Sequence, residues 1–264
     1  MNNFGKPILV CALAALLAGS TLSAGAAADD FRIETKVYVG KETEPASEDL
    51  TLFRGEQVYD FLNKPVEITV FDKPRSRVIL LDPVRRVKAE MTMERIMAFS
   101  DELRTWCGKQ ADPLLKFAAE PSFDQSLDGT TGELVFTSPF LTYRVATVKA
   151  GTDDIARQYL EFSNSYARLN AMTNPGSTPP FPRLKIDEAL FVSHAIPAKV
   201  QLTIPPRSRF GGKPMIVRSE HSVNWRLLES DQQKIQEAEE FLVTFTPLTL
   251  ERYLGSAPPA PAKR

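Results

Sequence analysis

From Phe31 onward, hydrophobic and polar positions alternate with a period of two. Ile33, Val37 and Val39 fall in one phase with Thr35, and charged side chains fall in the other. Successive side chains of a β-strand point to opposite faces, so this alternation predicts a half-buried strand. Similar short segments follow, separated by the Asn, Asp, Lys and Pro residues typical of turns. We predict these further strands at 50–53, 57–62, 66–71, 77–81 and 86–91.

The period then changes to that of a helix. Ile96, Phe99, Leu103 and Trp106 recur at intervals of three and four residues, and Thr92 is a suitable N-cap. A stronger helical pattern follows Thr152, which we predict as a second N-cap. The apolar stripe of this second helix consists of Ile155, Tyr159, Phe162, Tyr166 and Leu169.

The segments around the second helix are less regular. We expect a polar loop at 121–132, a hairpin of strands at 133–137 and 141–148, and a proline-rich connector at 174–183. Four prolines exclude a helix or a central strand from this connector. After it we predict a short helix at 184–191, strands at 199–204 and 215–223 joined by a turn at Gly211 and Gly212, and a last helix that opens with a capping box of Ser230 and Gln233.

The order of these elements predicts an α+β protein with helices set against an antiparallel sheet. We expect one domain at 29–255, made of an N-terminal meander at 31–92 and a helix and strand part at 93–250. The segment 256–264 is rich in Pro and Ala and is predicted to be a disordered tail.

The N-terminus has the pattern of an export signal. Lys6 precedes an uncharged apolar run from Ile8 to Ala18, and small residues lead to Ala28. The run is shorter than the roughly 20 residues that a membrane-spanning helix needs. We therefore predict a cleaved signal peptide at 1–28, no lipid anchor, and a periplasmic or secreted protein that does not span a membrane.

The charge balance and the cysteine content bear on the class of protein and on how its fold is stabilised. Without Lys6 the chain holds 31 basic and 33 acidic residues, so it lacks the basic excess of a nucleic-acid-binding protein. Cys107 is the one cysteine left after cleavage and can form no internal disulfide. We expect it to be a small buried hydrophobic residue, and we expect the core to hold the fold together.

Catalytic and metal-binding motifs are missing from the sequence. His194 and His221 do not have the spacing of metal ligands, and no nucleophile elbow, P-loop or dinucleotide fingerprint occurs. A single histidine on an apolar face is more often a hydrogen-bonded core residue than a base. We therefore expect no enzyme activity, no cofactor and no metal.

Aromatic side chains give the best candidates for ligand binding. Tyr59 and Phe61 share one face of a strand, while Val58 and Leu62 are apolar on the other. A strand that is apolar on both faces is buried on both, so one face packs under helices and the other is available to line a cavity. Our candidate ligand-binding residues are Tyr59, Phe61, Phe71 and Trp106.

The meander itself resembles a known family. Its strands read GEQVYDFL, VEITVFD, VILLDP and VKAEM, after an early strand at 31–39. This pattern resembles the LolA/LolB-like superfamily of exported lipoprotein and lipid carriers. The resemblance implies a curved, unclosed antiparallel half-barrel with helices packed across one face, and a cavity for lipid or lipoprotein acyl chains. The whole chain also looks like exported proteins of bacteria such as planctomycetes.

Three functions remain open. The first is a non-enzymatic binding protein that holds a lipid or other apolar ligand, which requires a pocket of several hundred Å³. The second is a structural or interaction protein of the cell envelope, which requires an exposed apolar patch or self-association. The third is an extracytoplasmic hydrolase, which requires His194 or His221 beside an acidic or nucleophilic side chain in a cleft.

Overall fold

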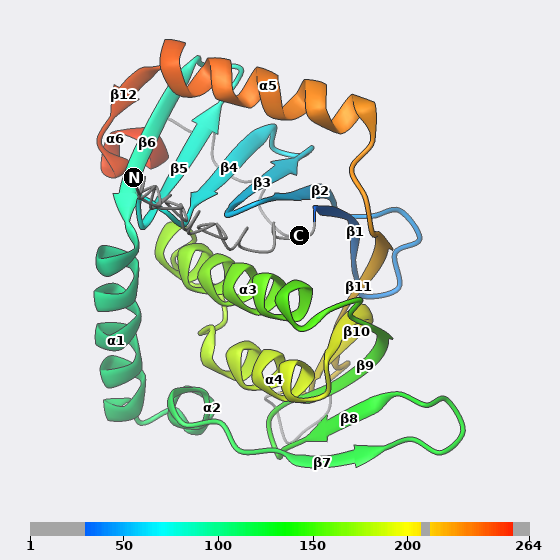
Figure 1. Ribbon diagram of the computed structural model, residues 1–264. Coiled ribbons are helices and arrows are strands. Elements are labelled where there is room, and N and C mark those ends of the chain that lie inside the picture. Colours follow the sequence, from blue (N-terminus) through cyan, green and yellow to red (C-terminus); the bar gives the residue numbers. More distant parts are fainter. Residues whose placement is uncertain (1–29, 207–211, 256–264) are drawn as a thin grey trace, which may run out of the picture.

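The computed structural model describes residues 30–206 and 212–255. The predicted signal peptide, the predicted tail and Gly211 of the predicted turn lie outside the described residues. Within them, twelve strands form one sheet in the order β12-β6-β5-β4-β3-β2-β1-β11-β10-β9-β8-β7. The sheet curves around α3 and is not closed (Figure 1). The predicted α+β class with a curved, open sheet is therefore confirmed.

The N-terminal meander is also confirmed. Its strands are β1 (Phe31–Val39), β2 (Ser47–Arg54), β3 (Gln57–Leu62), β4 (Glu67–Asp72), β5 (Arg77–Asp82) and β6 (Val87–Thr92). Gly55 and Glu56 form a two-residue turn between β2 and β3, where Arg54 pairs with Gln57. Gly55 has a φ of +58°, a conformation that favours glycine in such tight hairpins.

β1 joins the two halves of the sheet. One edge of β1 pairs with β2, and the other pairs with β11 (Met215–Asn224), so that Thr35 lies between Asp49 and His221. The rest of the sheet continues through β10 (Ala195–Ile204), β9 (Thr142–Lys149), β8 (Leu134–Thr137) and β7 (Asp124–Leu127). All of these pairings are antiparallel.

Six helices are described. They are α1 (Met93–Lys109), α2 (Pro113–Ala119), α3 (Asp153–Thr173), α4 (Phe181–Val192), α5 (Glu229–Thr244) and α6 (Leu250–Gly255). The predicted caps of α1 and α3 are confirmed. The hydroxyl oxygens of Thr92 and Thr152 accept hydrogen bonds from the amides of Arg95 and Ile155, each at 3.2 Å.

Helices cover both faces of the meander. On one face, Leu52, Tyr59 and Val70 pack against Ile235 and other residues of α5. On the opposite face the sheet packs against α1, α3 and α6 in a cluster of Phe71, Val78, Leu80, Ile96, Leu169 and Tyr253. Figure 1 shows strands β2 to β6 between α5 and α3. Burial on both sides explains why β5 is continuously apolar from Val78 to Leu81.

The structure corrects two of the predicted element boundaries. The segment 121–132 is not all loop, because β7 hydrogen-bonds to β8 despite four exposed side chains. α4 begins at Phe181 inside the connector, with Pro180 as N-cap and Pro182 in its first turn. Proline is tolerated there because the first amides of a helix have no partner within it.

The C-terminal elements also differ from expectation. α5 begins at Glu229, and Asp231 accepts a hydrogen bond from the amide of Leu228 at 2.8 Å, so the predicted capping box of Ser230 and Gln233 is wrong. β12 (Thr246–Leu248) pairs parallel to β6, and α6 follows it. A three-residue strand with a distant partner leaves no local pattern in the sequence.

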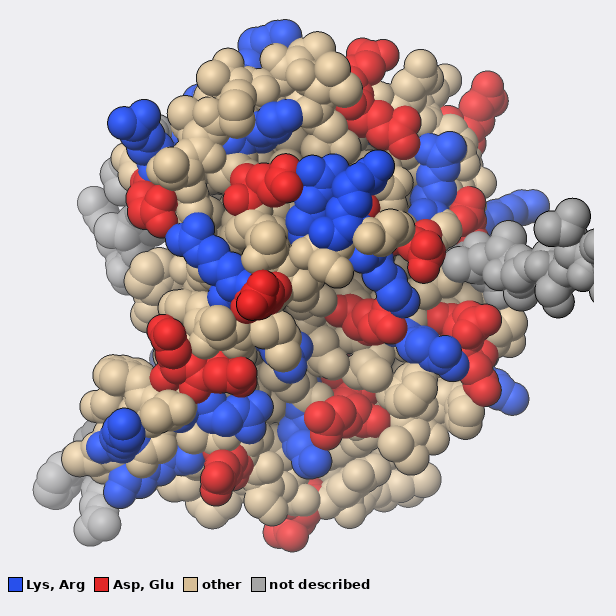
Figure 2. All heavy atoms as spheres, turned by 60° about the vertical axis from the view of Figure 1, so that its left-hand side comes forward, with Lys and Arg blue, Asp and Glu red and all other residues tan. Residues whose placement is uncertain are grey.

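Charges of both signs are interspersed on the surface. Figure 2 shows Lys and Arg beside Asp and Glu over most of the visible face, without a broad region of one sign. Cys107 is completely buried, as expected for a small hydrophobic residue, and burial raises the pKa of its thiol.

A buried polar network joins α3 to α4. The guanidinium of Arg183 donates to Asp187 Oδ1 at 2.9 Å and to the Tyr159 hydroxyl at 3.0 Å, and Ser163 donates to Asp187 Oδ2 at 2.7 Å. Burial raises the pKa of Asp187 even though Arg183 and Ser163 favour the carboxylate. The ion pair itself lies within α4, and the hydrogen bonds of its two members with Tyr159 and Ser163 hold α3 and α4 in one orientation.

We expect Asp187→Ala to lower the free energy of unfolding by about 3 kcal/mol, because it leaves Arg183 without its carboxylate in a largely buried site. The double variant Arg183→Met/Asp187→Leu should lose less, since no charge is then stranded. Urea unfolding followed by circular dichroism measures both. A double variant as unstable as Asp187→Ala would contradict this account.

Candidate functional site

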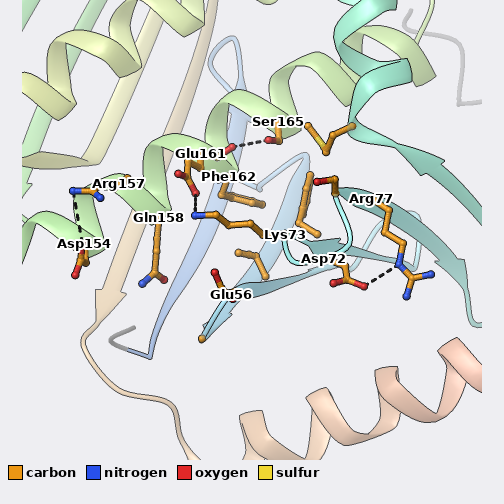
Figure 3. A pocket seen from close by; sticks show the side chains of 15 residues that line it. Glu56, Asp72, Lys73, Arg77, Asp154, Arg157, Gln158, Glu161, Phe162 and Ser165 are labelled. Atoms are coloured by element: carbon orange, nitrogen blue, oxygen red, sulfur yellow. Dashed lines mark hydrogen bonds and ion pairs between the residues drawn. The ribbon is translucent and has the colours of Figure 1, made fainter. Parts of the chain in front are cut away.

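A cavity of about 370 Å³ lies between α3 and the turns that join β2 to β3 and β4 to β5. Its floor is apolar and consists of Val58, Phe71, Met93 and Phe162. Side chains around the opening are charged, and they come from the two turns and from α3 (Figure 3). The cavity therefore combines an apolar interior with a polar entrance.

Aromatic packing fixes the floor. Phe162 of α3 makes edge contacts with Phe53 and Phe71, with ring centroids 5.4 and 5.2 Å apart. Tyr166 lies 5.7 Å from Phe162 on the same helix. Such arrangements favour defined ring orientations. The apolar floor is accordingly a preformed surface.

An ion pair links the two sides of the cavity. Lys73 Nζ, in the turn after β4, lies 2.7 Å from Glu161 Oε2 on α3. Figure 3 shows Lys73 extended from the turn toward Glu161. Both side chains are about half exposed, so the pair contributes little to stability. It can open at small cost, which suits a position beside an entrance.

Two lining side chains contain buried polar atoms for which the described part of the chain supplies no hydrogen-bond partner. They are both amide atoms of Gln158 and Oδ1 of Asp72. The other carboxylate oxygen of Asp72 accepts from Arg77 at 2.8 Å and from Arg75 at 3.0 Å. Burial alone would raise the pKa of Asp72, but these two arginines outweigh it and lower the pKa. Unpaired buried polar groups are costly, so a bound molecule with polar atoms would be favoured here.

A second cavity, of about 460 Å³, lies away from the sheet between α1, α2 and the connector before α4. A third, of about 640 Å³, opens on the α5 side of the meander and is lined in part by Leu50, Phe61 and Lys234. Charged residues of both signs border it, among them Lys36 and Glu237. Lys234 Nζ lies 5.7 Å from the centre of the Phe61 ring and covers it.

The four predicted ligand-binding residues lie in four separate places. Tyr59 is buried under α5, with its hydroxyl 3.0 Å from Gln57 Oε1 and 3.2 Å from Glu239 Oε1. Phe61 faces the 640 Å³ cavity, Phe71 forms part of the 370 Å³ cavity, and Trp106 lies at the 460 Å³ cavity. Ligand binding by each of them stays a prediction.

The sequence did not identify most of the residues that line the 370 Å³ cavity. Phe162 was recognised only as part of a helical stripe, because a stripe does not show which of its members border a cavity. Lys73 and Glu161 are 88 positions apart and carry no shared pattern. The proline turn before β5 was the only signal near Lys73.

Both histidines have nearby polar partners. His194 Nδ1 lies 2.7 Å from Asp153 Oδ1, and both side chains are more than half exposed. His221 lies with Nδ1 3.0 Å from Thr35 Oγ1 and Nε2 2.9 Å from Ser219 Oγ. Burial, with a smaller effect of Arg183, lowers the pKa of His221 to about 3. Both histidines thus lie close to a polar side chain, as the hydrolase hypothesis requires. Neither lines any of the three cavities, so its requirement for a cleft is not met.

The described ranges contain neither a candidate metal site nor a candidate membrane-spanning helix. No group of three or more His, Cys, Asp or Glu side chains there has the arrangement of a metal site. None of the helices among residues 30–206 and 212–255 is both long and apolar enough to cross a bilayer.

The fold can be compared with that of a solved structure. No family model and no curated protein match the chain. Among solved structures, the chain is similar to the crystal structure of LolA superfamily protein NE2245 from Nitrosomonas europaea, with a TM-score of 0.28 and 7% sequence identity. The match covers 77% of this chain and 88% of that chain.

Buried carboxyl groups on the α3 side of the meander predict a dependence on pH. Asp60 is 4% exposed and accepts a hydrogen bond from Thr51 at 2.7 Å. Burial, with smaller effects of Asp49 and Glu67, raises the pKa of Asp60 to about 7. Burial likewise raises the pKa of Asp49 to about 6.

An unfolded aspartate titrates near pH 4. Between about pH 4 and 7 the folded chain therefore keeps a proton on Asp60 that the unfolded chain has released, so stability falls as pH rises through this window. Asp60→Asn is neutral at every pH and keeps an oxygen for Thr51. We expect wild type to lose about 2–4 kcal/mol more than Asp60→Asn between pH 4 and 8 in urea unfolding. Parallel pH profiles would contradict a buried neutral Asp60.

Proposed function

We propose that the protein binds a lipid or another amphipathic apolar ligand in the 370 Å³ cavity, and that it holds this ligand without transforming it. The observation that carries the proposal is the continuous apolar floor of Val58, Phe71 and Phe162 beneath a charged entrance. Transfer of an apolar chain from water onto such a floor is favourable in proportion to the area buried. A polar head group would remain at the entrance.

The charges at the entrance favour an anionic or polar head group. Lys73 and Arg157 both border the cavity, and each has an exposed carboxylate as its partner, Glu161 at 2.7 Å and Asp154 at 3.8 Å. A ligand carboxylate or phosphate can replace Glu161 as the partner of Lys73. Binding would then open the ion pair across the entrance, and the new ion pair between Lys73 and the ligand would replace it.

The proposal includes the compartment. A signal peptide predicted at 1–28 supports a role outside the cytoplasm, in the periplasm or the medium. A carrier of apolar molecules is needed wherever such molecules cross an aqueous space. The resemblance of the meander to exported lipid carriers agrees with this role.

The second candidate is an interaction protein of the cell envelope. One observation favours it: the 460 Å³ cavity has a largely apolar lining, to which Trp106, 52% exposed, belongs. Exposed aromatic surface of this kind is typical of contact sites between chains. The two functions use different surfaces and can be tested separately.

We expect Ser165→Trp to abolish or strongly weaken ligand binding, because the indole would fill the entrance of the 370 Å³ cavity. Asn170→Trp, on the exposed side of the same helix, is the matched control. Native mass spectrometry of protein purified without detergent should find a lipid on wild type and on the control only. Titration with cis-parinaric acid should give a Kd at least tenfold higher for Ser165→Trp. Equal binding by both variants would place the ligand elsewhere, and no binding by wild type would reject the function.

We expect Lys73→Glu to speed release of bound cis-parinaric acid three- to tenfold, since the carboxylate of the ligand then loses its cationic partner and faces two acidic side chains at the entrance. The swap Lys73→Glu/Glu161→Lys restores opposite charges and should return the rate to within twofold of wild type. Stopped-flow displacement by oleate measures the rates. If release from Lys73→Glu is as slow as from wild type, Lys73 does not hold the head group of the ligand.

A further inference from the structure

Three carboxyl groups lie next to one another on the face of the meander that α3 covers. Asp60 of β3 lies diagonally across from Asp49 of β2 and from Glu67 of β4, because both of these residues pair with Leu62. Such diagonal neighbours on one face of a sheet are about 7–8 Å apart. We call Asp49, Asp60 and Glu67 the carboxyl cluster.

The hydrogen-bond partners of the carboxyl cluster are uncharged. Asp60 accepts a hydrogen bond from Thr51 at 2.7 Å, and Glu67 accepts one from the Tyr253 hydroxyl at 2.8 Å. Oδ1 of Asp49 is buried and has no partner in the described part of the chain. Hydrogen bonds from hydroxyl groups compensate for only part of the cost of burying a charge. The three groups are therefore poorly suited to being ionised together in this position.

Few other charges act on the carboxyl cluster. Those that do are Glu48 of β2, Asp82 at the end of β5 and Arg85 in the turn after it. Arg85 is already paired with Asp82 at 2.6 Å. On the β1 side, Thr35 separates Asp49 from His221, whose pKa of about 3 leaves it without charge above pH 5. Ionisation of the cluster would thus increase repulsion beneath α3.

Tyr166 of α3 connects the carboxyl cluster to the floor of the 370 Å³ cavity. The centroid of its ring lies 5.7 Å from that of Phe162 and 6.4 Å from that of Phe71, and both phenylalanines line the cavity. Burial, with smaller effects of the three carboxyl groups, raises the pKa of the Tyr166 hydroxyl well above its usual value. The side chain therefore has its ring beside the floor and its hydroxyl near the cluster.

We propose that the carboxyl cluster is a pH-dependent switch for the position of α3 and, resting on the function proposed above, for the affinity of the cavity. While the cluster is protonated, α3 stays seated and Tyr166 supports the floor. When the cluster loses its protons, repulsion and the need for water favour an opened state, in which Tyr166 and Phe162 have moved away from the sheet. Because the two equilibria are linked, ligand binding takes up protons.

The direction of the effect follows from the protons that each state holds. Burial raises the pKa of Asp60 to about 7 and that of Asp49 to about 6, and it also raises the pKa of Glu67. Water that reaches the carboxyl groups in the opened state returns their pKa values toward about 4. The seated state holds more protons, so a rise from pH 5.5 to pH 8.5 favours the opened state.

The fluorescent probe N-phenyl-1-naphthylamine tests the switch, because it is apolar and carries no charge between pH 5.5 and 8.5. For wild type we expect its Kd to rise about five- to twentyfold between these two values. In Asp60→Asn, which cannot ionise, the Kd should change by less than about twofold. Asp128→Asn removes a carboxyl group of the β7–β8 hairpin that pairs with Arg144, and this control should keep the dependence of wild type.

Hydrogen exchange measures the position of α3 without a ligand. After correction for intrinsic rates, amides of α3 in wild type should exchange at least about fivefold faster at pH 8.5 than at pH 5.5, with α5 as the internal reference. Asp60→Asn should abolish this difference. Equal Kd values for wild type at both pH values, or an equal pH dependence in Asp60→Asn, would overturn the proposal. If the probe binds at neither pH, the proposed function fails, and α3 exchange that does not change with pH would overturn the switch separately.

Discussion

The pairing of β1 on both of its edges is the constraint on which the rest of the structure depends. β2 extends the sheet from one edge of β1 toward the meander, and β11 extends it from the other toward β7. Arg32 of β1 also forms an ion pair at 3.2 Å with the buried Asp231 at the start of α5. Within the described residues, no other strand of one half of the sheet pairs with a strand of the other half.

The same strand supports the floor of the 370 Å³ cavity. Phe31 stacks on Phe53 of β2 with ring centroids 3.9 Å apart, and Phe53 contacts Phe162, which in turn contacts Phe71. This row of rings runs from the centre of the sheet to the cavity. The position of α3 over the meander is therefore coupled to the register of β1, and the buried network around Asp187 fixes the other side of α3 against α4.

Local patterns were enough to predict most of the fold. The strands of the meander and the caps at Thr92 and Thr152 depend on neighbouring residues, so they could be read from spacing. β12 could not, because its partner β6 lies far away in the chain. The start of α4 was missed because prolines in a first helical turn look like those of a loop.

The candidate site was predicted only in part for the same physical reason. Phe71 was chosen as one of the aromatic residues that recur through the strands of the meander. The cavity itself arises where α3 crosses the turns of two hairpins, and its entrance joins Lys73 to Glu161 from different elements. Such crossings are set by tertiary packing.

The two edges of the sheet are both short. β12 has three residues, including Pro247, and β7 has four exposed residues. Neither edge offers a long row of free amides and carbonyls to an extra strand. Large-scale aggregation through backbone hydrogen bonds is thus disfavoured at both ends of an open twelve-stranded sheet.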